Sequence, residues 1–186
     1  MLIKALIVIG LLLGVFLIVV SLRPSDFRYT RTASIFAPPA IVFAQVNDLH
    51  KWEAWSPWAK MDPNAKTIYD GADSGLGAGF GWASGKTGEG HMTITESRPD
   101  SLIRIRLEFK KPFAATNTAE FTFTPEGDHT TVSWSMFGKN NFMGKAFGMF
   151  VDCEKMCGDQ FSQGLGDMKK IAEGEIKSPA HAVSRN

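Results

Sequence analysis

The 186-residue sequence lacks most features that mark metal-binding, disulfide-stabilised or nucleic-acid-binding proteins. Its two cysteines, Cys153 and Cys157, are four residues apart, a spacing at which a disulfide inside one helical turn is geometrically unfavourable. None of the four histidines has metal-ligand spacing; they are His50, His91, His129 and His181. The formal net charge is only +1, whereas nucleic-acid-binding proteins carry a basic excess. The composition therefore predicts no metal site and no nucleic-acid partner.

Signatures of nucleophilic catalysis and of cofactor binding are also missing. Neither Ser56 nor Ser135 lies in a Gly-x-Ser-x-Gly context. The glycines at 75, 77 and 79 run directly into strand-like residues, whereas a phosphate-binding loop must lead into a helix. We therefore assign no catalytic residue and expect no cofactor.

Residues 1–22 form the longest apolar run, in which Lys4 is the only charged residue. About twenty apolar residues cross the hydrocarbon core, whereas signal-peptide cores are usually shorter and end at small residues. We expect a retained transmembrane anchor of the bacterial inner membrane; a cleaved signal peptide is the alternative. The basic residues after this run favour a cytoplasmic domain, whereas a span starting at residue 2 is typical of anchors that export their domain. Both orientations stay open.

The rest of the chain predicts a linker at 23–26, one folded domain at 27–174 and a flexible tail at 175–186. A first strand at 27–36 is followed by two short helices, with prolines at 38, 39 and 57 marking their ends. Further strands are predicted at 66–69, 77–84, 89–97, 102–109, 117–124 and 131–137, separated by turn residues. Apolar residues at helical spacing over 141–173 predict one long C-terminal helix.

Several strands alternate between apolar and polar residues, as a half-buried antiparallel sheet requires. Ile103, Ile105 and Leu107 share one face, whereas Arg104 and Arg106 share the other. Glu120, on the polar face of the next strand, is predicted to pair with an arginine. The apolar face needs a cover, and the long helix is the largest element that can supply it. The predicted fold class is therefore α+β, with a curved seven-stranded antiparallel sheet gripping the C-terminal helix.

Short motifs placed in order along residues 27–173 carry a family resemblance. They include Ile35-Phe36-Ala37-Pro38-Pro39, Trp55-Ser56-Pro57-Trp58, Gly75-Leu76-Gly77-Ala78, Met92-Thr93-Ile94-Thr95-Glu96-Ser97 and Thr131-Val132-Ser133-Trp134. With these motifs the chain resembles the helix-grip superfamily, which includes START-like lipid-transfer domains, plant pollen allergens and the polyketide cyclase/dehydrase-like group. The resemblance implies a cavity for an apolar ligand between sheet and helix.

We therefore expect a membrane-anchored carrier of a hydrophobic small molecule or lipid. The predicted cavity residues are Trp52, Trp55, Trp58, Tyr69, Phe80, Trp82, Ile94, Ile105, Leu107, Asn117, Phe121, Phe123, Trp134, Phe150 and Phe161. Asn117 and Tyr69 would orient the ligand, and Phe150 and Phe161 would face the sheet from the helix.

Two other functions stay open at this level. A cyclase- or dehydratase-like enzyme would use His91 or Glu96 inside the cavity, but alternation with Met92 and Ile94 predicts that His91 points outward. A structural or interaction domain would have no ligand, and Trp52, Trp55 and Trp58 would then be core residues.

Overall fold

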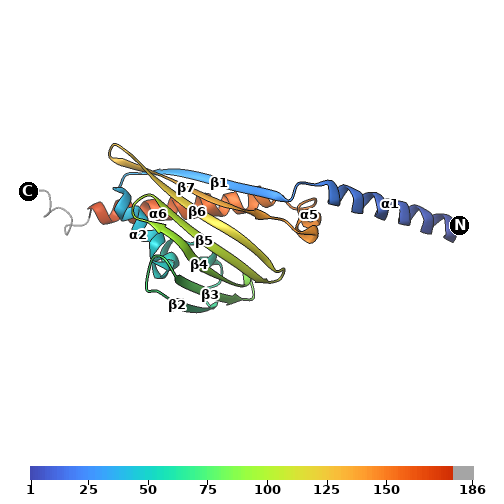
Figure 1. Ribbon diagram of the computed structural model, residues 1–186, viewed down its shortest axis with the longest axis horizontal. Coiled ribbons are helices and arrows are strands. Elements are labelled where there is room, and N and C mark those ends of the chain that lie inside the picture. The colour runs from blue at the N-terminus through green and yellow to red at the C-terminus, as the bar shows by residue number, and fades with distance from the viewer. Residues whose placement is uncertain (178–186) are drawn as a thin grey trace, which may run out of the picture.

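The computed structural model describes residues 1–177 (Figure 1). They form an apolar N-terminal helix, a seven-stranded antiparallel sheet wrapped around a long helix, and several short helices. The helices are α1 Leu2–Leu22, α2 Pro39–Asn47, the 3-10 turn η1 Leu49–Lys51, α3 Trp52–Trp55, α4 Pro57–Met61, α5 Phe142–Phe147 and α6 Cys153–Lys177. The strands are β1 Asp26–Ile35, β2 Lys66–Gly71, β3 Ala78–Ser84, β4 Gly88–Arg98, β5 Leu102–Lys111, β6 Ala115–Glu126 and β7 His129–Lys139. The predicted α+β helix-grip fold is confirmed.

The strand order is β1-β7-β6-β5-β4-β3-β2, with antiparallel neighbours throughout. From β2 to β7, each strand is joined to the next by a hairpin and pairs with it. Strand β1 pairs with β7, which is far from it along the chain. The sheet has two ends, which we name by their position. The α1 end holds Asp26, Ser84, Gly88, Lys111 and Lys139, and the far end holds the opposite turns, at 72–77, 99–101 and 127–128.

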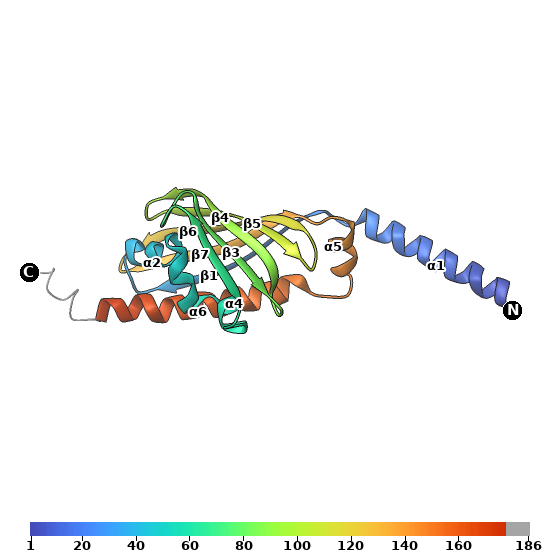
Figure 2. The same cartoon turned by 90° about the horizontal axis from the view of Figure 1, so that it is seen from below.

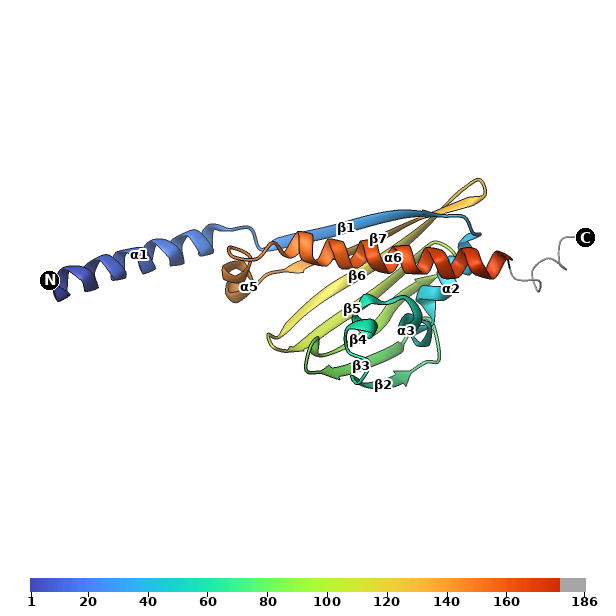
Figure 3. The ribbon, with the colours of Figure 1, turned by 180° about the vertical axis from the view of Figure 1, so that it is seen from behind.

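Helix α6 lies along the concave face of the sheet and packs mainly on β1, while α2, α3 and α4 lie over part of the rest of that face (Figures 2 and 3). On the sheet, Ile103 and Ile105 are completely buried, whereas Arg104 is exposed on the convex face. Arg104 donates to Glu96 and Glu120, each at 2.7 Å, so the predicted pairing of Glu120 with an arginine is confirmed. Alternation alone correctly separates the two faces of this strand.

The C-terminal segment differs from the single helix predicted over 141–173, because it divides into α5 and α6. Asn141 caps α5 by accepting from the backbone N–H of Gly144 at 2.9 Å, and Asp152 accepts from that of Lys155 at 2.9 Å. Two capping side chains eleven residues apart start two separate helices, because each satisfies N–H groups that lack helical partners. Helix α6 continues to Lys177, past the predicted start of the tail; residues 178–186, including His181, lie outside the described residues.

The helical segment after β1 also divides further than predicted, into α2, η1, α3 and α4. Ser56 has an extended backbone before Pro57, which ends α3 and starts α4. The bend allows Trp55 and Trp58 to reach the core from separate short helices, and Trp55 is completely buried.

Candidate functional site

Towards the far end, stacked aromatic rings fill the space between the sheet and α6; we call this part the closed half of the concave face. Trp134 of β7 stacks on Phe161 of α6, with ring centroids 4.3 Å apart, and on Phe121 of β6, at 4.8 Å. Trp52 and Trp55 meet these rings edge-on and are buried. The closed half is packed like an ordinary core.

Both tryptophans of α3 are held by hydrogen bonds as well as by packing. The indole N–H of Trp52 donates to the carbonyl of Val46, and that of Trp55 donates to the carbonyl of Gln45, each at 3.0 Å. These two carbonyls belong to the last turn of α2, where helical partners run out. The two tryptophans therefore fasten α3 to α2, which is a structural role.

Close approach of α6 to the sheet depends on Gly164. A Cβ at this position would lie 2.9 Å from the Trp134 ring and 3.1 Å from Pro57 of α4. Glycine lowers helix propensity by about 1 kcal/mol, so its presence here reflects the tight packing of three elements. The helix can thus press flat against the aromatic cluster.

Towards the α1 end the concave face is lined by apolar side chains that stay half-buried; we call this part the open half. The strand register aligns two rows across it, Trp82-Gly90-Phe109 and Phe80-Met92-Leu107-Asn117. Trp82 and Phe109 meet edge-on at 5.9 Å, and a Cβ at Gly90 would overlap the Trp82 ring. Apart from the buried Met92 and Gly90, these side chains have intermediate exposure. They form a concave apolar strip of the kind that lines small-molecule sites.

Two buried polar atoms have no hydrogen-bond partner among the described residues: Nε1 of Trp134, a donor, and Oε1 of Gln160, an acceptor. Trp134 stacks on Phe161, so its unpaired N–H belongs to the sheet–helix stack; Gln160 is the residue before Phe161 on α6. More than nine in ten buried polar groups in proteins are hydrogen-bonded. An unpaired buried donor and an unpaired buried acceptor are each suited to a polar group of a ligand.

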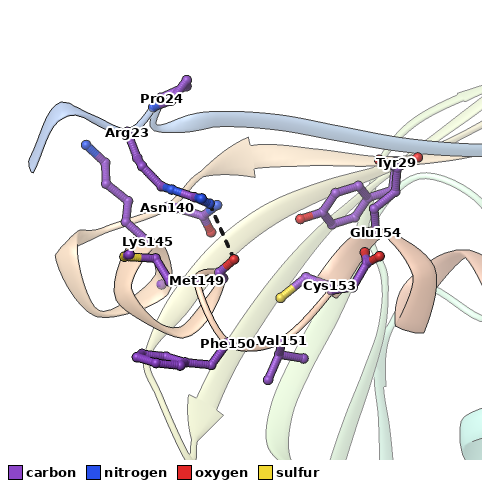
Figure 4. A pocket seen from close by; sticks show the side chains of 13 residues that line it. Arg23, Pro24, Tyr29, Asn140, Lys145, Met149, Phe150, Val151, Cys153 and Glu154 are labelled. Atoms are coloured by element: carbon purple, nitrogen blue, oxygen red, sulfur yellow. Dashed lines mark hydrogen bonds between the residues drawn. The ribbon is translucent and has the colours of Figure 1, made fainter. Parts of the chain in front are cut away.

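A pocket of about 430 Å³ lies where the end of α1, α5 and the start of α6 meet β1 (Figure 4). Arg23 and Lys145 border it on one side, and Tyr29 and Cys153 border it on the other. Burial raises the pKa of Tyr29 to about 12, with a smaller contribution from the nearby thiols and carboxylates of Cys153, Cys157, Glu154 and Asp152. Burial, and then Cys153, raises the pKa of Cys157 to about 11, so both groups stay protonated at neutral pH.

The predicted cavity residues therefore divide into separate groups. In the closed half lie Trp52, Trp55, Trp58, Ile94, Ile105, Phe121, Phe123, Trp134 and Phe161. In the open half lie Phe80, Trp82, Leu107 and Asn117. Tyr69 lies beyond both on the edge strand β2, where its ring stacks on His50 at 4.0 Å.

The prediction that Phe150 faces the sheet from the C-terminal helix is wrong. Phe150 lies in the connection between α5 and α6, is 78% exposed, and contacts Phe16 of α1 with ring centroids 6.2 Å apart. Its helical spacing from Phe161 has no structural meaning, because Asp152 interrupts the helix between them.

The two candidate acid–base residues lie on the convex face. His91 is hydrogen-bonded to Asp70 at 3.0 Å and borders a hollow of about 720 Å³ with Thr93, Arg106 and Glu108. Its outward direction agrees with the alternation of β4, in which Met92 and Ile94 are buried. Glu96 forms ion pairs with Arg98 and Arg104. Among residues 1–177, no group of three His, Cys, Asp or Glu side chains is placed to hold a metal ion.

Gln160, Tyr29 and Cys157 are site residues that the sequence analysis missed. Gln160 is a polar residue of α6 next to the core residue Phe161, and a glutamine in that position carries no sequence pattern that marks it as buried. Tyr29 alternates inward on β1, so the period-two pattern of this strand contained the signal.

Comparison with known proteins places the domain in a family. The model of a family described as polyketide cyclase / dehydrase and lipid transport matches residues 26–173. No curated protein sequence matches the chain.

Solved structures share the fold at low sequence identity. A crystal structure of a protein from Chromobacterium violaceum is 16% identical, covers 81% of this chain and 99% of its own, and has a TM-score of 0.57. The Aha1 dimer from Colwellia psychrerythraea is 11% identical, with coverages of 79% and 96% and a TM-score of 0.56. Ara h 8.0201 is 13% identical, with coverages of 81% and 97% and a TM-score of 0.53.

Proposed function

Because this chain belongs to the polyketide cyclase / dehydrase and lipid transport family, we propose that it is a membrane-anchored domain that binds an apolar small molecule or lipid in the open half of its concave face. The observation that carries the proposal is the half-buried apolar strip of Trp82, Phe109, Phe80 and Leu107; Trp134 Nε1 and Gln160 Oε1, which have no partner among the described residues, would supply polar contacts. Most ligand sites combine a largely apolar lining with a few orienting polar groups.

The closed half limits where such a ligand would lie. Trp134, Phe161 and Phe121 are at most 2% exposed, so a ligand could not lie between their rings. These rings would form the inner wall of the site. Leu107, Trp82 and Phe109 would form the opposite wall. Burial of about 200 Å² of apolar ligand surface would contribute roughly 5 kcal/mol before association costs, which supports weak to moderate affinity and broad specificity.

Helix α1 supports the membrane part of the proposal. Its 21 residues rise about 30 Å at 1.5 Å per residue, which matches the hydrocarbon core of a bilayer. Only Val20 of this helix is buried, so the other apolar side chains need a solvent other than water. We propose that α1 is retained as the anchor; intact-mass analysis of the membrane fraction would reveal a chain beginning near Arg23 if it were cleaved instead.

No catalytic role is part of the proposal. The two candidate acid–base side chains, His91 and Glu96, face away from the open half and are engaged by Asp70 and by arginines. General acid–base catalysis requires the titratable group within hydrogen-bonding reach of the substrate.

The direct test is binding by the full chain in detergent. Co-purified apolar compounds are identified by mass spectrometry, and fatty acids, sterols and isoprenoid quinones are then titrated in turn. Leu107→Trp should fill the strip and weaken retention of the bound compound at least about tenfold, because the larger ring occupies the ligand's space.

Ile68→Trp is the matched control, because Ile68 is 68% exposed on the edge strand β2, outside the strip. Both variants should keep the β-sheet circular-dichroism spectrum of the unmodified chain. Failure of every apolar compound to bind, or equal loss in the two variants, contradicts the site.

A further inference from the structure

Helix α5 and the connection to α6 expose a dense group of large apolar side chains. The exposed fractions are 43% for Phe142, 57% for Met143, 47% for Phe147 and 78% for Phe150. The segment 142–151 contains one charged residue, Lys145, among these side chains. A contiguous apolar patch on a protein surface marks a contact with another apolar phase.

The last turns of α1 pack directly on this segment (Figures 1 and 2). Val20 is completely buried, and Phe16 meets Phe150 at 6.2 Å. Lys145 Nζ donates to the carbonyl of Ser21 at 3.3 Å, and Arg23 donates to the carbonyl of Gly148 at 3.4 Å. These contacts hold α5 against the end of the anchor.

The packing fixes the depth of α5 relative to the bilayer. Phe16 precedes Leu22, the last residue of α1, by six positions, which is about 9 Å along a helix axis. Where α1 spans the bilayer, Phe150 is therefore level with acyl chains rather than with water. Lys145 lies beside the end of α1, where a lysine reaches the headgroup region.

Charge is distributed unequally between the two ends of the domain. Strand termini and turns at the α1 end carry the basic residues Arg23, Lys66, Lys86, Lys111 and Lys139, with Asp26 paired to Lys139 and Glu89 paired to Lys111. The corresponding positions at the far end carry the acidic residues Asp73, Asp100, Glu126 and Asp128, with Arg98 paired to Glu96. The net charge of +1 is that of the whole chain and does not reveal this separation.

We infer that the α1 end of the domain is a second membrane contact: α5 and residues 148–151 insert among the acyl chains of the leaflet that α1 enters, and the basic turns rest on anionic headgroups. Each lysine or arginine near an anionic surface contributes about 1 kcal/mol. The acidic far end points away from the same surface. This inference rests on the proposed anchor and deepens it.

If the α1 end docks on the membrane in this way, the proposed ligand can come from the adjoining leaflet. The pocket at the α1 end adjoins α5 on one side and Tyr29 of the concave face on the other (Figure 4). With the α1 end on the leaflet, the Trp82-Gly90-Phe109 row, the row of the open half nearer that end, would lie close to compounds dissolved in the leaflet. The ligand class is therefore a membrane-dissolved amphiphile.

The test uses the full chain reconstituted in vesicles of phosphatidylcholine, with or without about a third of phosphatidylglycerol, whose acyl chains carry bromine as a tryptophan quencher. Three single tryptophan additions serve as probes, each read after subtraction of the unmodified chain. Phe150→Trp reports α5, and Phe113→Trp, 57% exposed in the β5–β6 turn, reports the sheet at the α1 end. Leu76→Trp, 66% exposed in the turn at the far end, is the matched control.

The Phe150→Trp signal should be quenched at least about twofold more than that of Leu76→Trp in both lipids, because insertion of α5 is apolar. Quenching of Phe113→Trp should require phosphatidylglycerol and should disappear at high salt, because the basic turns act through screened charge. Equal quenching of Phe150→Trp and Leu76→Trp overturns the inference, and so does Phe113→Trp quenching that ignores lipid charge and salt.

Flotation and intact mass of the same samples separate this inference from the proposed anchor. A chain that lacks α1 and does not float contradicts the anchor and the docking together. A floating, full-length chain without Phe150→Trp quenching contradicts the docking alone and leaves ligand binding to its own test.

Discussion

The closed and open halves of the concave face are built from the same strands, yet only one of them is packed solid. In β5, Ile103 and Ile105 are completely buried, whereas Leu107 and Phe109, on the same face, are half-buried. The difference comes from what lies opposite. Ile103 pairs in register with Phe121, which Trp52 and Trp55 meet edge-on, whereas Leu107 pairs with Asn117 and Phe109 with Ala115. An alternating strand thus specifies an apolar face, but the elements across from it decide whether that face becomes core or site.

Truncation of a large side chain should separate the two halves most strongly. Phe161→Ala should lower the free energy of unfolding by about 3–5 kcal/mol, because it leaves a cavity within a fully packed cluster. Phe109→Ala, in the open half, should cost about 1 kcal/mol, because its ring is already partly in solvent. Urea unfolding of the full chain in detergent measures both. Equal losses would mean that the two halves are packed alike.

Cysteine reactivity examines how closely α6 packs beside Tyr29 of β1, at the α1 end of the concave face. Because burial raises the pKa of Cys157 from 9.0 to about 11, its thiolate is about a hundredfold scarcer near pH 8 than that of an unperturbed thiol. In a Cys153→Ser background the larger cause, burial, remains, so iodoacetamide labelling should still be slow and should keep rising about tenfold per pH unit up to about pH 10. Levelling off near pH 10 would show a thiol with an unperturbed pKa and contradict the burial of Cys157.

Replacement of Gln160 should raise the stability of the ligand-free chain and weaken ligand binding. Gln160→Leu removes an unpartnered buried acceptor, so the ligand-free chain should gain about 1 kcal/mol in stability. Binding of the apolar ligand should weaken about tenfold, because the orienting hydrogen bond is lost. Gln163→Leu, exposed on the same helix, is the matched control and should change neither quantity. Loss of stability in Gln160→Leu would contradict the assignment.

The smallest expected effect concerns the ion pair that ties α4 to α6 over the closed half. Lys60 donates to Asp167 at 2.7 Å, and this bond, followed by that of Lys170, lowers the pKa of Asp167 below 3.8. The stability that it contributes is therefore present above pH 3.8 and is lost as the pH falls through the lower, folded-state pKa. Asp167→Asn should cost under about 1 kcal/mol at neutral pH, because Lys60 is largely exposed. Thermal unfolding from pH 3 to 7 provides the measurement, and an unchanged pH profile in the variant would contradict it.

Much of the candidate site could be predicted from strand periodicity, because side chains alternate strictly across a sheet. Phe80 and Trp82 occupy alternate positions of β3, and Phe80 aligns through Met92 with Leu107 of β5, so spacing puts all three on one face. The position of Phe150 could not be predicted, because helical spacing continues through Asp152 in the sequence although the helix does not. Gln160 could not be identified, because an unpaired acceptor is defined by the neighbours that it lacks in space.

The sequence by itself determined the fold class, the apolar α1 segment and the two faces of the sheet. Each of these follows from local patterns: an uninterrupted apolar run, a period of two and turn residues between strands. Tertiary structure alone decided that the tryptophans of α3 fill one half of the concave face while the other stays half-open. It also placed α5 beside the last turns of α1 and gathered basic turns at that end. Such features depend on packing between segments more than a hundred residues apart, and no local pattern records which segments will meet.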